Sequence, residues 1–371
     1  MQLAFTPEQA DLRRALRDLC RDLATDADLR RMVDLPGGFD PKIWDQLAAM
    51  GLVGLAVPEE YGGAGCGWVE VGVVLEELGR ALLPAPYLST AVLAVAALVE
   101  FDDRDANAEY LPRIADGSLV ATLGVTAASA GWDAAGIAVS ALAEAGAWIL
   151  DGHTSYVCDG VSADLLLVLA RIPGGSIGLF GVDGASPGVK RTDLQVVDLT
   201  RPQARIDLLG VRARLIGEPD ATWERGARVL DVAAMALAAE SVGGAQRVLE
   251  MAVDYAKIRQ QFGRPIGSFQ AIKHLCADML VRVESARSAA YYALHAATAG
   301  GAVLATSASL AKAHCCDAFL HAAEQNVLVH GAIGLSWEHS AQLYLKRAKT
   351  TDLMFGDSAR HRELLAQRIG L

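Results

Sequence analysis

The stretch RQQFGRPIGSFQ, residues 259–270, interrupts a region that otherwise has the pattern of long helices. Arg259 ends one helical segment, Phe262 and Gly263 break the pattern, and Pro265 prevents its immediate resumption. An arginine fork can donate two hydrogen bonds to a phosphate or pyrophosphate, and a phenylalanine can pack against an adenine or ribose face. Gln270, at the start of the next helix, can add an amide donor. The alternative is a helix-capping arginine beside a core phenylalanine, and residue types alone support both interpretations about equally.

On the N-terminal side of this stretch, the spacing of hydrophobic residues along the chain changes twice. Residues 1–117 read as helices, including TPEQADLRRALRDLCRDL, DPKIWDQLAAMGL and the nearly all-apolar VEVGVVLEELGRALL, which we expect to be buried. Residues 118–223 contain short Val/Leu/Ile runs separated by Gly, Asp and Pro turns, which predicts a small barrel or sandwich. Residues 224–371 return to amphipathic helices over 224–258, 271–299, 303–330 and 338–353. The predicted fold class is therefore α+β with segregated helical, β and helical domains.

Bulk properties limit the function. The 371 residues are 52% hydrophobic and carry a formal net charge of −11, which argues against nonspecific nucleic-acid binding but not against a small anionic ligand. No apolar run is long enough for a membrane span, and the first residues lack the pattern of a secretory signal. The six cysteines show no CxxC or zinc-like spacing, so we expect unpaired thiols in a reducing cytoplasm and no metal site.

Two further motifs favour ordinary structural roles. The segment GGAGCG, residues 62–67, does not lie between a strand and a helix, so it is interpreted as a turn and not as a dinucleotide loop. His330 and His339 are separated by nine residues across a Gly-rich loop, which favours polar packing over metal ligation. No Walker loop, GxSxG elbow or HExxH sequence is present.

The segment YAKIRQQFGRPIGSFQAIKHLCADM, which contains the opening stretch, resembles the signature of the acyl-CoA dehydrogenase family. Three other segments resemble that family in the same order, so that the resemblance spans essentially the whole chain. They are VPEEYGGAGCGWVEVGVVLEELGR, GAWILDGHTSYVCDGVSADLLLVLAR and VHGAIGLSWEHSAQLYLKRAK. The resemblance implies an N-terminal helical domain, a middle β-barrel domain and a C-terminal four-helix bundle.

The resemblance also implies FAD as cofactor, an acyl-CoA substrate and an electron-transfer flavoprotein or similar acceptor. In the family a carboxylate removes an α-proton from the thioester and the β-hydrogen leaves as hydride to the flavin. The Arg-x-x-Phe-Gly motif of one subunit grips the FAD of its neighbour in a tetramer. Carried over to this chain, the cofactor-binding positions are Arg259, Phe262, Gln270, Tyr156, Val157, Cys158, Thr126, Gly331 and Gly334.

The chain departs from the family pattern at the catalytic base. The glutamate of the family's Tyr-Glu-Gly-Thr stretch corresponds here to Gly356, with Asp357 one residue away on a shorter side chain. A second base position used by some members corresponds to Ala233. Glu240, seven residues further along the same helical face, has Ala and Gly neighbours that would leave room for a ligand. Glu240 is thus a candidate base and Asp357 a weaker one, and the alternative for Glu240 is a structural contact with a buried arginine or with a partner at an interface.

Flavin-side positions depart as well. The family's Thr-Glu-Pro-x-x-Gly-Ser-Asp loop appears as TAASAGWD, residues 126–133, its Trp-Ile-Thr as residues 156–158, and a common glutamine as Leu328. The pyrophosphate-gripping residues are retained. This asymmetry resembles one half of the heteromeric α2β2 enzymes of actinobacterial sterol side-chain breakdown, in which unlike subunits share each flavin site.

Four hypotheses follow from these observations. The chain acts with a paralogous subunit, or as a self-sufficient homotetramer using Glu240 or Asp357, or as a structural subunit that binds no flavin alone, or in another flavin reaction such as oxygenation. The sequence leaves the acyl group, fatty or steroidal, undecided, although small residues over 233–245 would suit a bulky one.

Overall fold

The computed structural model describes residues 5–127, 131–144, 146–219, 222–298 and 301–371. These form two compact units. The first, here called the bundle unit, comprises Met1–Arg30, Trp68–Leu83 and Ala234–Leu371. The second, the barrel unit, comprises Arg31–Gly67 and Pro84–Ala233.

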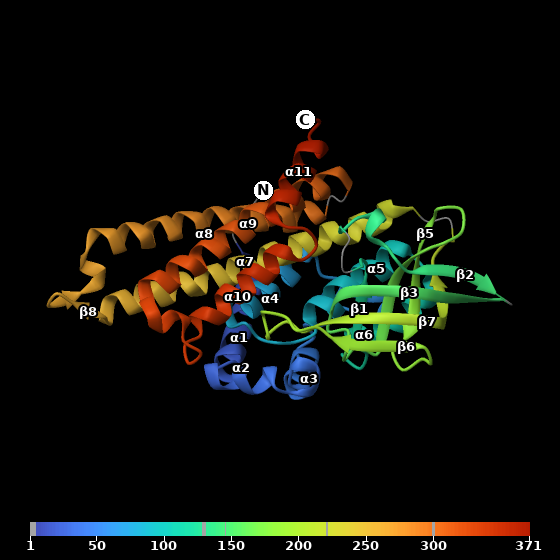
Figure 1. The fold of residues 1–371 in the computed structure, drawn as a ribbon, viewed down its shortest axis with the longest axis horizontal. Helices are drawn as coiled ribbons and strands as arrows, with labels where there is room; N and C mark the ends of the chain where they lie inside the picture. The colour runs from blue at the N-terminus through green and yellow to red at the C-terminus, as the bar shows by residue number, and fades with distance from the viewer. Residues whose placement is uncertain (1–4, 128–130, 145, 220–221, 299–300) are drawn as a thin grey trace. The chain divides into compact units, whose positions relative to one another are not determined.

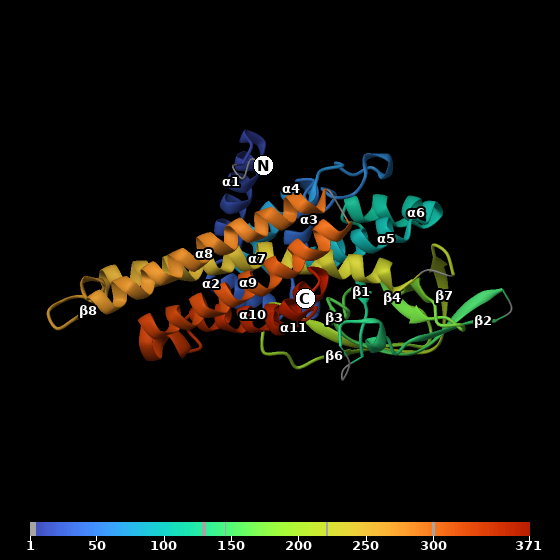
Figure 2. The same ribbon diagram turned by 90° about the horizontal axis from the view of Figure 1, so that it is seen from above.

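Long helices make up the bundle unit (Figures 1 and 2). Helix α9 packs against α8, α10 and α11, α4 packs against α1 and α8, and a short hairpin joins the ends of α7 and α8. The four predicted C-terminal helices are present within a few residues of their expected limits, and α11 lies beyond them. The helices are α1 (Pro7–Leu23), α4 (Trp68–Ala81), α8 (Gln270–Ala297), α9 (Gly301–His330), α10 (Ala341–Leu353) and α11 (Ser358–Arg368), with α7 (Trp223–Ile258) from Ala234 onward; α2 (Asp26–Val33) begins in this unit.

Close packing of α4 against α7 depends on glycine. A Cβ atom added at Gly79 would lie 2.3 Å from the backbone oxygen of Glu240, and one added at Gly243 would lie 1.8 Å from the backbone oxygen of Glu76. The small residues along α7 therefore bring two helix backbones together. The expectation that they leave room for a ligand beside Glu240 is wrong, because α4 occupies that space.

Helix α1 is anchored to the bundle by buried carboxylates. Its N-terminus carries a capping box between Thr6 and Gln9. Glu76 and Glu77 of α4 are both buried, and Arg13 of α1 donates to each of them at 2.7 and 2.9 Å. Such buried charges are tolerated only when they are paired, which explains two adjacent glutamates on a helix that is otherwise apolar nearly all round.

In the barrel unit, the strands form one sheet of seven that closes on itself (Figure 1). β4 pairs with β5, β5 with β7, β7 with β3, β3 with β2, and β2 returns to β4 through one parallel pair, Ser140 with Arg171. β1 and β6 add to β4 and β7. Of the two predicted β architectures, the barrel is thus the one observed. The strands are β1 (Ala121–Gly124), β2 (Ser140–Glu144), β3 (Ala147–Cys158), β4 (Leu165–Arg171), β5 (Ile177–Asp183), β6 (Val189–Asp193) and β7 (Gln203–Ile216).

Helices of the same unit include α3 (Pro41–Ala49), α5 (Val95–Phe101) and α6 (Arg104–Ala115), with a π-helical stretch at Leu88–Ala94. Trp44 of α3 donates its indole N–H to the Gly117 carbonyl at 2.8 Å. No two of the six cysteines form a disulfide. Among the described helices, none is long and apolar enough to cross a membrane.

Candidate functional site

The opening stretch is a β-hairpin at the junction of α7 and α8. β8 (Gln260–Gln261) pairs with β9 (Arg264–Pro265), which leaves Phe262 and Gly263 as a two-residue loop. Both have positive φ, 51° and 77°, as a type I′ hairpin turn requires. A phenylalanine at positive φ is uncommon, and this turn directs its ring into solvent, where it is 92% exposed.

The functional groups of this hairpin face outward. Arg259 and Gln270 are exposed, so the core phenylalanine of the structural alternative is not observed at Phe262. Phe269 supports the loop, because its ring meets Phe262 edge-on at 6.1 Å and carries the guanidinium of Arg264 at 4.2 Å from its centroid. An apolar pocket of about 490 Å³ lies beside the hairpin, flanked by Lys257 and Lys273. The hairpin therefore presents an arginine fork and an aromatic face to solvent.

The second Gly-rich segment forms a 3-10 turn, Gly331–Leu335. Gly331 has a φ of 68°, and a Cβ added at Gly334 would lie 3.0 Å from the Cβ of His330, so this turn favours glycine at both positions. His330 stacks on Tyr255 at 4.2 Å and lies 4.5 Å from the His339 ring. Burial lowers the pKa of His330, whose Nδ1 lies 2.8 Å from the Asn326 carbonyl oxygen. These contacts match the polar packing expected for the histidines.

In the barrel unit, Thr126 lies beside strand β3. Ser155 N–H donates to the Thr126 carbonyl at 2.7 Å, and the Thr126 hydroxyl donates to the Gly131 carbonyl at 2.8 Å. Tyr156, which follows Ser155 in β3, has a φ of 57° at a β-bulge and is 38% exposed, whereas Val157 and Cys158 are buried. The Ser155 hydroxyl is buried without a hydrogen-bond partner among the described residues. Residues 128–130 of the TAASAGWD loop lie outside the described residues.

Glu240 forms a buried ion pair. Its Oε1 accepts a hydrogen bond from Nη1 of Arg347 on α10 at 2.6 Å, and both residues are 3% exposed. Of the two roles left open for Glu240, this is the geometry of the structural pair. Arg347, which sequence inspection did not single out, supplies the charge.

The segment equivalent to the family's base is a rigid turn. Phe355 and Gly356 both have positive φ, 57° and 99°, and a Cβ at Gly356 would lie 3.2 Å from Cγ of Arg360. Lys312 of α9, fully buried, donates its three N–H groups to the carbonyls of Thr351, Asp352 and Gly356 at 2.9, 2.9 and 3.0 Å. Nε2 of His361 lies 3.1 Å from the carbonyl oxygen of Phe355. The turn therefore presents backbone where the family places a carboxylate.

Asp357, the other candidate base, is the N-cap of α11. Its Oδ1 accepts a hydrogen bond from the Arg360 backbone N–H at 2.8 Å. The roles of Lys312 and Ser155 could not be predicted from the sequence. A lysine that donates to three carbonyls, or a hydroxyl without a partner, has no local sequence pattern of its own. The cap of α11 was detectable, since an aspartate directly precedes a helical segment there.

Comparison with known proteins agrees with the geometry. The profile of the acyl-CoA dehydrogenase N-terminal domain matches residues 6–118, and that of the C-terminal domain matches residues 223–370. The acyl-CoA dehydrogenase IpdE2 of Mycobacterium tuberculosis is 34% identical over 92% of this chain and 91% of its own length. FadE34 of the same organism is 36% identical over 97% of this chain, which spans 48% of that relative.

Solved structures with the same fold include a variant of the steroid acyl-CoA dehydrogenase Tcur3481–Tcur3483, with 31% identity and a TM-score of 0.89 over 98% of this chain and 97% of that one. The ChsE4–ChsE5 complex of Mycobacterium tuberculosis matches with 26% identity and a TM-score of 0.91 over 100% and 99%. This chain belongs to the acyl-CoA dehydrogenase family, whose members are flavin-dependent oxidoreductases that act on CH–CH groups.

Proposed function

We propose that the chain is one subunit of a hetero-oligomeric acyl-CoA dehydrogenase that desaturates an acyl-CoA thioester with FAD as hydride acceptor. One contrast carries this proposal. The hairpin keeps its Arg and Phe and faces outward, whereas no candidate base position of the chain holds a carboxylate that is free to accept a proton from a substrate. Phe262 is 92% exposed, whereas Glu240 is ion-paired and Gly356 lies in a clamped left-handed turn.

The residues of the chain fit one end of a dinucleotide. Arg259 offers a guanidinium fork for the pyrophosphate and Phe262 an aromatic face for the adenosine, while Gln270 supplies an amide at the start of α8. On the barrel unit, the buried and unpartnered Ser155 hydroxyl beside Thr126 has donor capacity that a bound polar group would satisfy. FAD, when bound, would accept the hydride, and the residues of this chain would bind and orient it.

We assign the proton-abstracting carboxylate to a paralogous partner subunit. In this assignment Glu240 stabilises the crossing of α7 with α10 and Asp357 caps α11. Hydrophobic side chains exposed on the bundle unit, such as Val281, Leu328 and Leu335, at 69%, 66% and 64%, support an assembly that covers them. One structural neighbour, the ChsE4–ChsE5 complex, is an assembly of two differently named chains, which supports a hetero-oligomer.

The substrate and acceptor are proposed from the neighbours. A steroid-derived acyl-CoA is the first substrate to test, because the 31% identical neighbour is described as a steroid enzyme of this family. An electron-transfer flavoprotein is the proposed acceptor, since a neighbour of the same fold is described in connection with one.

The proposed assembly is tested by purifying this chain alone and by co-expressing it with a paralogous dehydrogenase subunit encoded by a neighbouring gene. We expect a colourless or insoluble chain alone and a yellow, active complex when the two are co-expressed. Stoichiometric flavin in an active homotetramer would overturn the proposal in favour of self-sufficiency. A complex that forms without flavin would identify a structural subunit instead.

A further inference from the structure

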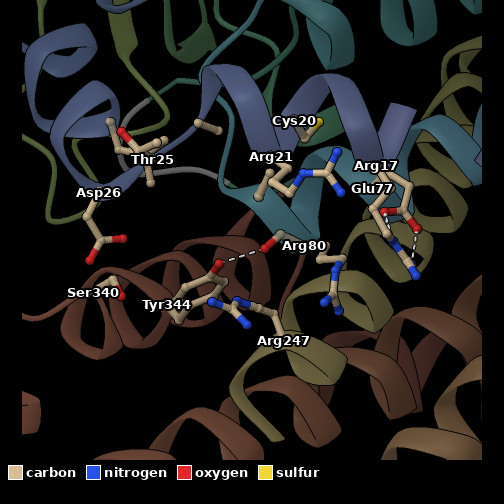
Figure 3. A pocket seen from close by; sticks show the side chains of 13 residues that line it. Arg17, Cys20, Arg21, Thr25, Asp26, Glu77, Arg80, Arg247, Ser340 and Tyr344 are labelled. Carbon is tan, nitrogen blue, oxygen red and sulfur yellow. Dashed lines mark hydrogen bonds and ion pairs between the residues drawn. The ribbon is translucent and has the colours of Figure 1, made fainter. Parts of the chain in front are cut away.

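A pocket of about 420 Å³ lies in the bundle unit, and none of the residues assigned to flavin above lines it (Figure 3). Its walls come from α1, the turn between α1 and α2, the end of α4, the middle of α7 and the first turn of α10. Its volume is within the range of small-molecule sites and exceeds what a single inorganic ion needs.

Four arginines line this pocket, in a chain whose net charge is −11. Arg17 and Arg21 come from α1, Arg80 from α4 and Arg247 from α7, so that guanidinium groups border the same space from three helices (Figure 3). Clustered like charges repel one another, and they are stable only where carboxylates or a bound anion offset them.

Carboxylates of the protein neutralise two of the four. Arg17 donates to both oxygens of the buried Glu77, at 2.9 and 2.6 Å. Arg80 makes a bidentate pair with Glu250. Burial lowers the pKa of the Arg80 guanidinium, but the hydrogen bonds and charge of Glu250 outweigh burial and raise it. These two arginines therefore have their strongest donors engaged.

The other two retain donors. Arg247 lies beside the Tyr344 hydroxyl, a neutral partner, and 3.9 Å from Oε2 of Glu250, a carboxylate that Arg80 already holds. Arg21 contacts Asp18 at 3.0 Å and Asp22 at 3.6 Å on the open surface of α1, where all three side chains are more than half exposed and such pairs contribute little. Arg21 and Arg247 are thus the guanidinium groups available to a ligand.

The remaining polar groups of the pocket are compatible with an anion, with one exception. Burial raises the pKa of Cys20 to about 12 and that of Tyr344 to about 12, so both stay neutral, and the Tyr344 hydroxyl donates to the Arg80 carbonyl. Ser340, the N-cap residue of α10, makes no capping hydrogen bond with its side chain. Asp26 is the exception, an exposed carboxylate at the start of α2.

We propose that this pocket binds a small polyanion of the diphosphate class, held by the forks of Arg247 and Arg21 from opposite walls and by the Ser340 hydroxyl. Arg17 and Arg80 contribute to the positive potential while they hold the walls through Glu77 and Glu250. Asp26 opposes the ligand and so limits its affinity. The pocket is independent of the flavin-binding hairpin and can be tested whether or not the chain is catalytic.

Inorganic pyrophosphate is the probe, titrated into the full chain, or its complex, in metal-free buffer at fixed ionic strength and followed by ³¹P NMR and calorimetry. We expect saturable binding that Arg247→Gln weakens by about tenfold or more, the effect of losing charge-assisted hydrogen bonds. Arg21→Gln should weaken it less, and Asp26→Asn should strengthen it. Because Arg21, Arg247 and Asp26 are each partly or largely exposed, these variants are expected to fold.

Two controls make the result decisive. Arg14→Gln removes the same charge from an exposed position of α1 outside the pocket, and it should leave binding unchanged. Arg259→Gln should also leave it unchanged, since the hairpin is a separate site. Absence of saturable binding, an equal effect of Arg14→Gln and Arg247→Gln, or loss of binding in Arg259→Gln would each overturn the proposal.

Discussion

Replacing Glu240 by glutamine separates the two roles that this residue can have. Glutamine keeps the length of the side chain and an oxygen that accepts from Arg347, and it removes only the negative charge. A general base would lose its function completely with this change. A structural ion pair would lose stability, because the buried guanidinium of Arg347 would lose the negative charge of Glu240.

The expected loss of stability in Glu240→Gln follows from the burial of the Glu240–Arg347 pair. Both side chains of the pair are only 4% exposed, and the contact is 2.6 Å long. Removing one partner from a buried pair costs about 3–5 kcal/mol, and the retained amide hydrogen bond places Glu240→Gln near the lower end, at about 3 kcal/mol. The double replacement Glu240→Gln with Arg347→Met should cost less than the sum of the two single changes, since both charges of the pair are removed together.

The assay is urea denaturation of each variant, followed by circular dichroism, together with turnover of the co-expressed complex. Asp254→Asn is the matched control on the same helix, because its pair with Lys257 is 69% exposed on both sides and its loss should change stability by no more than about 0.5 kcal/mol. If Glu240→Gln were as stable as the control and yet abolished turnover, the ion-pair role would be refuted and Glu240 would be the base.

Three further predictions concern the hairpin and the clamped turn. Arg259→Gln should reduce the flavin content of the co-purified complex without changing the circular dichroism of the chain, whereas Arg264→Gln, whose guanidinium covers Phe269, should retain flavin. Gly356→Glu should destabilise the chain by about 1–3 kcal/mol and fail to make it active alone, because a φ of 99° strains any residue with a Cβ; unstrained folding with activity would contradict this. Burial, and then the charge of Lys312, lowers the pKa of His361 to about 4. The folded chain thus binds fewer protons than the unfolded chain between pH 6.5 and 4, so stability should fall by roughly 3 kcal/mol at most as pH decreases through this window. Urea midpoints across that range should vary less in His361→Gln; identical pH profiles would show that His361 is not responsible.

Much of the fold follows from local patterns. Helical periodicity and turn residues predicted the order of helices, β strands and helices, because each element is long enough for its own hydrophobic spacing to be decisive. The hairpin between α7 and α8 was recognised as a break in the helices. Its strand pairing was not predicted, since two residues on each side are too few for a strand pattern and the turn places a phenylalanine where glycine or asparagine is usual.

Membership of the family, the presence of Arg259 and Phe262 and the absence of the usual glutamate at Gly356 can be read directly from the chain. The roles of the remaining charges depend on long-range packing. Glu240 and Arg347 are 107 residues apart and meet because α7 and α10 lie together, and Lys312 reaches the carbonyl of Gly356 from a helix 44 residues away. A buried charge is stable only where long-range packing brings its partner to it, and no local pattern contains that information.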